Sequence, residues 1–355
     1  LVSYVGYVRQ EVKATSGKIL KIVLVPDANM MEEVVVTGYG TFKKSAYAGS
    51  AASVKNEKIA DVPSVSFQDL LQGNATGVQF TSASGQPGSS ASLSIRGMGS
   101  FNASNSPLYV IDGVPVTSGS INSISSDGGL DAMSTVNTSD IENITIIKDA
   151  AAASLYGSRA ANGVILVQTK KGKAGKVSIS YDGYIDHDMV ANQPEVLSVD
   201  EFLAHERDVD FGHRVDWYDK LLNKSNLGQS HYLAVSGGGE NLTFRASANC
   251  KKKDGLDIAS SRKEYGVRMG FTAKTLEGLL ESQGNLSTRV INEEYVDYGV
   301  FQQAVKLNPT HPLMDEKDPS KYSTLYGFDT YNPVGWLKDK EDGGDRQFSL
   351  ADFKV

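Results

Sequence analysis

Few residues in this sequence have the types and spacing that catalysis or metal binding requires. Glu201 and His205 are four residues apart, which would place a carboxylate and an imidazole on one helix face where they could share a metal ion. The zinc-protease pattern H-E-x-x-H is incomplete at His205, because the second histidine is missing. A solvated helix face is therefore the favoured interpretation of this pair.

Motifs of other enzyme classes are absent as well. The sequence contains neither G-x-x-x-x-G-K-[ST] nor G-x-S-x-G, and its five histidines show no metal-ligand spacing. The single cysteine, Cys250, excludes an intramolecular disulfide and a cysteine-rich zinc site. We therefore expect a protein that is not an enzyme, with no catalytic residues, no cofactor and no metal.

One short segment has the composition of a binding peptide. Val34–Thr37 is strongly β-prone and lies between two glutamates and Gly38-Tyr39-Gly40. An ordinary buried strand explains this pattern, and so does an extended peptide that adds itself to the sheet of a partner.

Composition limits the classes of protein to consider. The 355 residues include 35 Lys+Arg and 42 Asp+Glu, a net charge of −7 that argues against a general nucleic-acid binder. The 35 glycines and 16 tyrosines favour many short strands and turns. No apolar run approaches the roughly 20 residues of a transmembrane helix, whereas a transmembrane β-barrel needs no such run. The first residues also lack the features of a signal peptide.

The first half of the chain has the pattern of a small α+β domain over residues 45–172. A short amphipathic helix is expected from Phe67 to Gly73. In the segment 108–116, Asp112-Gly113 supplies the positive φ angles of a two-residue hairpin turn.

The same domain continues with strands and one more helix. We expect strands at Ser92–Arg96 and Ile141–Lys148, and another that follows Gly163. Asp149 is a suitable N-cap for a helix that stops at Gly157.

From Lys176 onward, apolar and polar residues alternate. In 241–249 the leucine, phenylalanine and alanines share one face, whereas Arg245 lies on the other; in 264–272, Tyr265 and Arg268 lie on opposite faces. Long strands with one polar face are typical of an outer-membrane barrel, whereas sandwich strands are shorter, about 5–6 residues. A capping box at Ser198 predicts a helix, and residues 305–345 are expected to form a long loop.

Three segments together identify a resemblance. These are EEVVVTGYG, SIRGMGSFNASNSPLYVIDGVPV (Ser94–Val116) and DIENITIIKDAAAASLYGSRAANGVILVQTKKGK (Asp140–Lys173). They resemble the SusC/RagA family of TonB-dependent outer-membrane transporters. The resemblance implies an α+β plug domain followed by the start of an antiparallel transmembrane β-barrel, which has 22 strands in the family. It divides the chain into the end of a carboxypeptidase-D-like regulatory β domain (1–28), a TonB-box linker (29–44), the plug domain (45–172) and the first barrel strands and loops (173–355).

The resemblance also implies a function and partners. The family imports glycan or peptide nutrients across the bacterial outer membrane, driven by TonB with ExbB and ExbD, and usually works with a SusD-like surface lipoprotein. The plug and the N-terminus would face the periplasm.

By the same resemblance, two sets of residues receive roles. The TonB box, which would pair with TonB as an added strand, comprises Glu33, Val34, Val35, Val36, Thr37 and Gly38. The plug signature comprises Arg96, Gly97, Gly99, Asp112, Gly113, Lys148, Asp149, Tyr156, Gly157, Arg159 and Gly163. Of these, Arg96, Lys148 and Arg159 either hold the plug against acidic residues of the barrel wall or are simply solvated.

One departure from the family pattern concerns length. Residues 176–355 are too few for 22 strands of about 10 residues each, and their pattern suggests about six. We therefore expect an N-terminal fragment that cannot transport by itself. The alternatives are a secreted β-rich binding or adhesion protein, and a cell-envelope glycoside hydrolase that uses two carboxylates. A single hydrophobic interior shared by residues 45–172 and the later strands would favour the adhesion protein.

Overall fold

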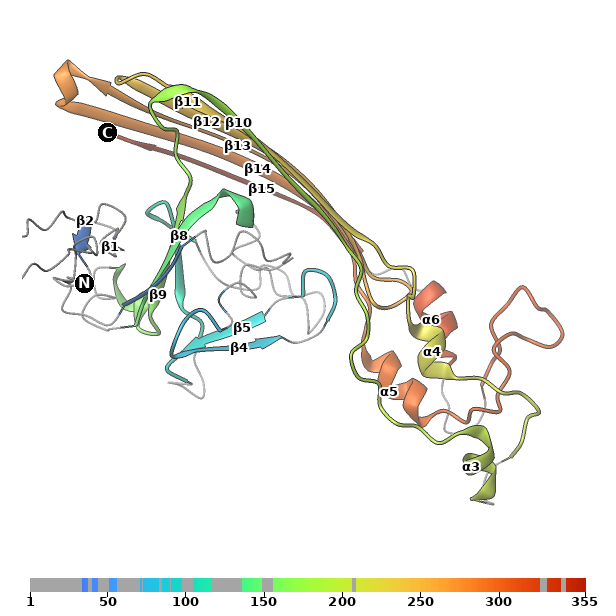
Figure 1. Ribbon diagram of the computed structural model, residues 1–355. Helices are drawn as coiled ribbons and strands as arrows, with labels where there is room; N and C mark the ends of the chain where they lie inside the picture. The colour runs from blue at the N-terminus through green and yellow to red at the C-terminus, as the bar shows by residue number, and fades with distance from the viewer. Residues whose placement is uncertain are drawn as a thin grey trace, which may run out of the picture.

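Figure 1 presents the computed structural model of the chain. It describes residues 34–37, 40–43, 51–55, 71, 73–82, 85–89, 91–97, 105–116, 136–148, 156–205, 209–325, 331–339 and 343–355. Residues 1–28, almost all of the helix expected from Phe67, and the helix expected after Asp149 up to Leu155 lie outside the described residues.

The N-terminal domain is built on a five-stranded mixed sheet. The strand order is β3-β8-β9-β6-β7, in which β6 and β9 are parallel and the other neighbours are antiparallel. The strands are β3 (Ala51–Lys55), β6 (Leu108–Ile111), β7 (Val114–Val116), β8 (Ile141–Ile147) and β9 (Val164–Thr169). Two separate antiparallel pairs accompany this sheet, β1 (Val34–Thr37) with β2 (Gly40–Lys43), and β4 (Val78–Ser82) with β5 (Ala91–Ile95). Two 3-10 turns, η4 (Thr138–Asp140) and η6 (Ser158–Ala160), belong to the same domain.

The sequence explains why this sheet forms. Between β6 and β7, Asp112 has φ 48° and Gly113 has φ 86°, as the expected two-residue hairpin turn requires. Runs of branched apolar residues in β8 and β9 are almost fully buried and form the core of the domain. The expected strands at Ser92–Arg96 and Ile141–Lys148 are confirmed as β5 and β8.

The second half of the chain forms a six-stranded antiparallel sheet in which each strand pairs with the next along the chain. The strands are β10 (Gly175–Asp186), β11 (Gly228–Gly238), β12 (Leu242–Asp254), β13 (Ser261–Thr275), β14 (Leu280–Glu294) and β15 (Gly343–Lys354), with η7 (Leu276–Gly278) between β13 and β14. These strands are 11 to 15 residues long, well beyond the lengths common in sandwiches. The sheet is not closed, and it arches over the N-terminal domain (Figure 1).

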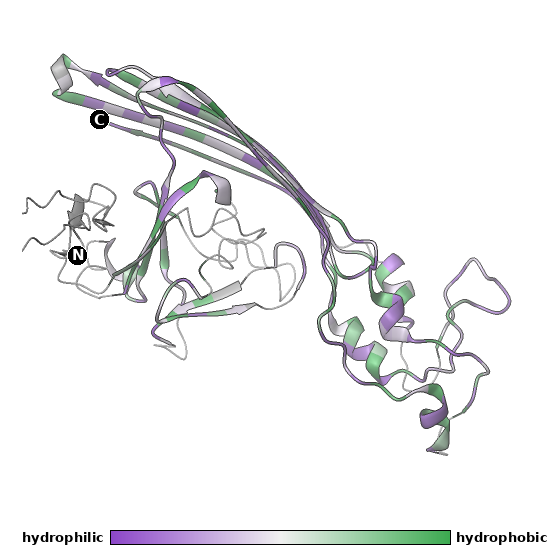
Figure 2. Cartoon of the chain, in the orientation of Figure 1, coloured by the Kyte–Doolittle hydropathy of each residue, from purple (hydrophilic) through white to green (hydrophobic). Residues whose placement is uncertain are grey.

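The two faces of this sheet differ as the alternation predicts. On the outer face, Tyr265, Val267, Met269 and Phe271 are 44 to 54% exposed. On the inner face of the same strand, Arg268 is 9% exposed. Figure 2 shows hydrophobic and hydrophilic residues alternating along these strands. Exposing such a row of apolar side chains to water is unfavourable in free energy, whereas the lipid-facing side of a membrane strand is expected to be apolar.

Short helices lie at the end of the sheet away from the N-terminal domain (Figure 1). They are α3 (Val199–Ala204), α4 (Trp217–Leu221), α5 (Gly299–Lys306) and α6 (Pro333–Asp339). The capping box at Ser198 is confirmed at α3. The long loop expected over 305–345 is wrong in part, because α6 and the start of β15 lie within it and because Asn332 Oδ1 accepts hydrogen bonds from the Val334 and Gly335 amides at the start of α6. No helix among the described residues is long and apolar enough to cross a membrane.

The N-terminal domain and the second half of the chain have separate hydrophobic interiors. Among the described residues, every core residue of the N-terminal domain lies between Val54 and Val167. A second core joins α4, α5 and α6, and it contains Trp217, Val300 and Leu337. The interior shared by both halves, which would favour a compact soluble protein, is therefore not found in the described part of the chain.

Candidate functional site

The turn between β6 and β7 carries the strongest contact between the N-terminal domain and the sheet. Asp112 Oδ2 accepts a hydrogen bond from Arg268 Nη2 of β13 at 2.5 Å, and the two side chains are only 8 and 10% exposed. Thr169 fixes this carboxylate from within the domain, because its amide donates to Oδ1 at 2.9 Å and its hydroxyl to Oδ2 at 2.7 Å. The Arg268 guanidinium also donates to Thr169 Oγ1 at 2.8 Å, which closes a three-residue network.

A second strand of the sheet holds the same turn. Lys354 of β15 donates a hydrogen bond from Nζ to the carbonyl oxygen of Asp112. A side chain at Gly113 would meet the same ammonium group at 3.0 Å. The tip of the hairpin is therefore held by two strands: the Asp112 carboxylate binds Arg268 of β13, and the Asp112 carbonyl oxygen binds Lys354 of β15.

A second carboxylate of the domain contacts two further strands. Asp140, in η4, is 4% exposed, and its Oδ1 accepts hydrogen bonds from Tyr232 Oη of β11 at 2.5 Å and Ser247 Oγ of β12 at 2.8 Å. Arg245 Nη2 donates to the Tyr232 hydroxyl oxygen at 2.8 Å. The Tyr232 hydroxyl group thus links the Arg245 guanidinium to the Asp140 carboxylate by two hydrogen bonds.

Further along the inner face, a ladder of buried charges abuts the domain. Arg262 pairs with Glu264 and Glu293, Arg289 also pairs with Glu264, and Arg289 Nη1 donates to the Val136 carbonyl at 3.1 Å. Gln86 makes two hydrogen bonds to the backbone of Val296, at 2.6 and 2.9 Å. Gly88 lies so close to Arg262 that an added Cβ would overlap the guanidinium group.

These contacts determine what the arrangement can do mechanically. The contacts named above are polar, and each hydrogen bond contributes about 0.5–1.5 kcal/mol, or about 1.5–3 kcal/mol where one partner is charged. A hydrophobic core would break all at once, whereas polar contacts of this kind break and re-form in water. Because the described parts of the domain and of the sheet share no hydrophobic core, loss of these contacts does not require the core of the domain to open.

The signature residues predicted from the sequence lie at different places in this arrangement. Arg96 and Arg159 are exposed, and Lys148 donates to the carbonyl and hydroxyl oxygens of Thr76. Burial, and then the nearby Arg96, lower the pKa of Lys148. In the described part of the chain none of these three cations pairs with a carboxylate of the sheet, so the role expected for them stays a prediction. The ion pair that does cross the contact has the opposite polarity, with the acid on the domain.

The other predicted residues divide into those that the structure describes and those that lie outside it. Tyr156 packs against the core, and Gly97, Gly157 and Gly163 have positive φ angles. Val34–Thr37 of the predicted TonB box forms β1, in which Val35 pairs with Phe42 of β2. Glu33, Gly38, Gly99 and Asp149 lie outside the described residues. Sequence reasoning assigned no role to Asp140, although this residue opens the Asp140–Lys173 motif, and none to Tyr232, which lies outside the quoted motifs.

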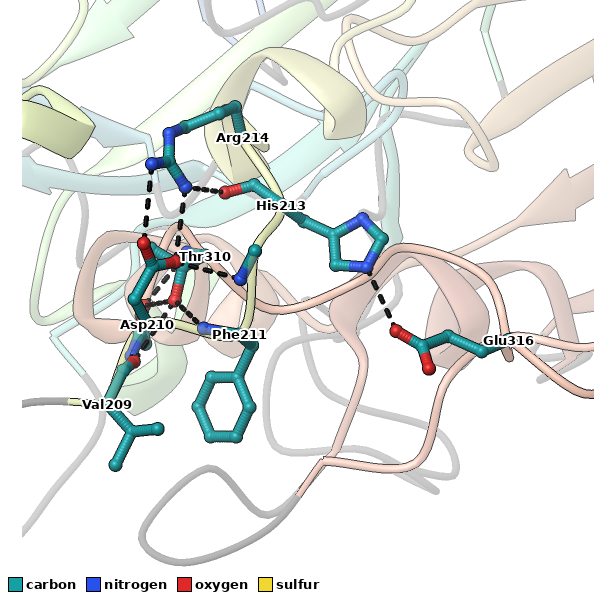
Figure 3. Close-up of polar contacts among 9 residues, drawn as sticks. Val209, Asp210, Phe211, His213, Arg214, Thr310 and Glu316 are labelled. Atoms are coloured by element: carbon teal, nitrogen blue, oxygen red, sulfur yellow. Dashed lines mark hydrogen bonds and ion pairs between the residues drawn. The ribbon is translucent and has the colours of Figure 1, made fainter.

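The loops at the far end of the sheet form a second candidate surface. Figure 3 shows the segment 209–214 joined to the loop that follows α5. Phe211 donates its amide to Thr310 Oγ1 at 3.1 Å, Arg214 pairs with Asp210 at 3.2 Å, and His213 Nε2 lies 3.2 Å from a Glu316 carboxylate oxygen. A groove of about 620 Å³ opens nearby between α3, α4 and α5. In the described part of the chain, no group of three or more His, Cys, Asp or Glu residues is arranged to hold a metal.

Known proteins resemble this chain in both sequence and structure. Residues 43–164 match the family model of the TonB-dependent receptor plug domain. TonB-dependent receptor SusC of Bacteroides thetaiotaomicron is 33% identical over 338 residues, which cover 92% of this chain and 33% of SusC. The RagAB peptide importer in its open-open state superposes with a TM-score of 0.73 at 25% identity, over 90% of this chain and 40% of that chain. The chain belongs to the SusC/RagA family of TonB-dependent transporters.

Family membership identifies the two halves of the structure. The N-terminal domain is the plug, and β10–β15 resemble the first strands of the barrel of a TonB-dependent transporter. TonB-dependent receptor P3 of Formosa agariphila is a further relative, 35% identical over 271 residues that cover 75% of this chain and 25% of the relative. The chain thus spans about a quarter to a third of the length of these curated relatives. The relatives are receptors and transporters, and none of them is named as an enzyme.

Proposed function

We propose that this chain provides the plug and the first barrel strands of a transporter that imports nutrients across the bacterial outer membrane. In this proposal the chain consists of a regulatory-domain remnant (1–28), a TonB-box linker (29–44), the plug (45–172) and barrel wall (173–355). TonB, energised by ExbB and ExbD, binds the linker from the periplasm and pulls it. The observation that carries the proposal is the plug core, which is separate from the wall, together with the polar contacts that join plug and wall.

The mechanism follows from how these contacts are distributed. The pull acts on the chain before β3, whereas Asp112 and Asp140 contact the wall further along the plug. Force would therefore reach the wall contacts through the plug sheet and break them in sequence, and water would replace each lost partner. A passage opens along the inner face of the wall, while main-chain pairing in β10–β15 keeps the wall intact.

Substrate and lid partner belong to the same proposal. The structurally similar RagAB is a peptide importer, so an oligopeptide is one candidate substrate class, and a glycan is the other. The packed cluster of α4, α5 and α6 at the far end of the sheet offers a rigid surface for a SusD-like lipoprotein. Growth of a strain that depends on this transporter, with oligopeptides or glycans as the nutrient source, distinguishes the two classes.

A backbone substitution in the TonB box tests the proposal. Val35→Pro removes an amide hydrogen from the strand, so main-chain pairing with TonB should fail, whereas Val35→Thr keeps the amide and a β-branched side chain. We expect the full-length transporter with Val35→Pro to lose both TonB capture and nutrient uptake, and the Val35→Thr control to keep both. Equal uptake by the two variants would show that Glu33–Gly38 is not the site of the pull.

A further inference from the structure

Where the plug continues into the wall, cationic side chains surround one small hollow. Lys170 and Lys171 follow β9 directly, Arg245 comes from β12 and Arg268 comes from β13. The hollow has a volume of about 20 Å³ and lies at the covalent junction between plug and barrel. Neither the plug contacts nor the proposed transport mechanism uses this space.

Two carboxylates near the hollow are already engaged. Asp112 is bound by Arg268 and Thr169, and Asp140 Oδ1 accepts hydrogen bonds from two hydroxyl groups. Lys171 donates to Gln283 Oε1 at 3.1 Å, which is a neutral acceptor. Burial and the adjacent Arg245 lower the pKa of Lys170, despite the opposing effects of Asp140, Asp182 and Glu142. The positive charge around the hollow is therefore only partly compensated.

One donor of Arg245, a residue that lines the hollow, has no acceptor among the described residues. The Nε atom of Arg245 is buried and makes no hydrogen bond among the described residues, although Nη2 of the same guanidinium donates to Tyr232. A buried donor without a partner costs about 1–3 kcal/mol. The four cationic side chains that line the hollow, of which Arg268 is already bound to Asp112, favour an acceptor that carries negative charge.

We propose that this hollow binds a small monovalent inorganic anion of the size of chloride. A volume of about 20 Å³ holds one or two water-sized particles, which admits a halide and is too small for a phosphate or an organic acid. The backbone shape keeps the space small, because Gly172 lies directly against the backbone of Phe244 and an added Cβ there would come within 2.5 Å of it. The bound anion would join Lys171 of the plug exit to Arg245 of the wall and so fix the point about which the plug moves.

Bromide tests the proposal directly, because it replaces chloride and has an anomalous X-ray signal. Crystals of the full-length transporter grown without halide and soaked in sodium bromide should show an anomalous peak in the hollow, within contact distance of Lys171 Nζ and of the Arg245 guanidinium. The peak should be absent from crystals of a Lys171→Gln variant treated in the same way. Density for water alone at this position, with no anomalous signal, would overturn the proposal.

A solution measurement separates specific binding from a general effect of salt. At constant ionic strength, replacing gluconate by chloride should raise the Tm of the full-length protein in a saturable manner, because an anion that binds the folded state stabilises it. Lys171→Gln should abolish this rise. The matched control is Lys274→Gln, which changes an exposed lysine on β13 and should leave the rise intact. An equal rise in both variants would refute an anion at the hollow, and it would leave the proposed transport function standing.

Discussion

The ion pair between Asp112 and Arg268 should carry a large share of the free energy that holds the plug against the wall. Both side chains are about nine-tenths buried, and Thr169 orients the carboxylate with two hydrogen bonds of its own. Asp112→Asn keeps the size of the side chain and removes the charge, which leaves the Arg268 guanidinium buried without an anionic partner. Arg268→Gln removes the other partner.

The expected magnitude follows from the burial of the pair. Hydrogen bonds to charged groups contribute about 1.5–3 kcal/mol; an effective dielectric constant near 20 gives a Coulomb attraction of about 4 kcal/mol at 4 Å, which the cost of desolvation partly offsets. We therefore expect a coupling energy of about 2 kcal/mol in a double-mutant cycle, equivalent to roughly a 30-fold change in the equilibrium between seated and displaced plug. The exposed pair Lys274–Glu281, 3.9 Å apart, is the matched control and should give less than about 0.5 kcal/mol.

The assay is the conductance of the full-length transporter in planar bilayers as urea is raised, because a displaced plug opens the channel. The midpoint should fall for Asp112→Asn and for Arg268→Gln, and the double variant should resemble the worse of the two single variants. If the effects of the single variants simply add, as expected for residues without contact, the proposed clasp between Asp112 and Arg268 is refuted.

Three further expectations concern the same contact between plug and wall. Gly88→Val should displace the plug at lower urea than Gly73→Val, because both glycines have positive φ, whereas an added Cβ overlaps Arg262 at Gly88 and meets nothing within 4 Å at Gly73; equal midpoints would contradict the position given to Gly88. Tyr232→Phe removes the hydroxyl that joins Asp140 to Arg245 and should weaken plug seating by about 1–3 kcal/mol, measured by the same conductance midpoint, while Tyr265→Phe on the outer face serves as control. Because the pKa of Lys148 is lowered in the folded plug, the unfolded state binds more protons, so the wild type should gain stability over Lys148→Gln as the pH rises towards the ordinary lysine pKa of 10.5; a constant difference in denaturant midpoint between pH 8 and 10.5 would argue against this shift.

Local chemistry explains why much of the fold could be predicted from the sequence. A two-residue turn at Asp112-Gly113 requires positive φ, and strict alternation in β12 and β13 permits only one assignment of faces. The helix α6 was missed because its cap depends on Asn332, in a segment whose proline, glycine and aspartate content resembles a loop. Helix starts of this kind depend on a single side chain, whereas strand patterns repeat over many residues.

The site itself could be predicted only in part, because its contacts join residues far apart in the chain. Asp112 and Arg268 are separated by 156 positions, and Asp140 and Ser247 by 107. The polar phase of each strand indicates that Arg268 faces inward, yet no local rule states which plug residue it meets. The polarity of the contact, with acids on the plug and bases on the wall, therefore emerges only from the fold.

In the proposed mechanism the plug covers the inner face of the wall at rest and leaves it when TonB pulls. Ser247 is 6% exposed and lies beneath Asp140, so a cysteine at this position reports the separation. In a full-length Cys250→Ala background, Ser247→Cys should react with a membrane-impermeant maleimide only when TonB and the proton gradient are both present, whereas Asn241→Cys, exposed in a turn, should react always. Labelling of Ser247→Cys that is the same with and without TonB would contradict the account.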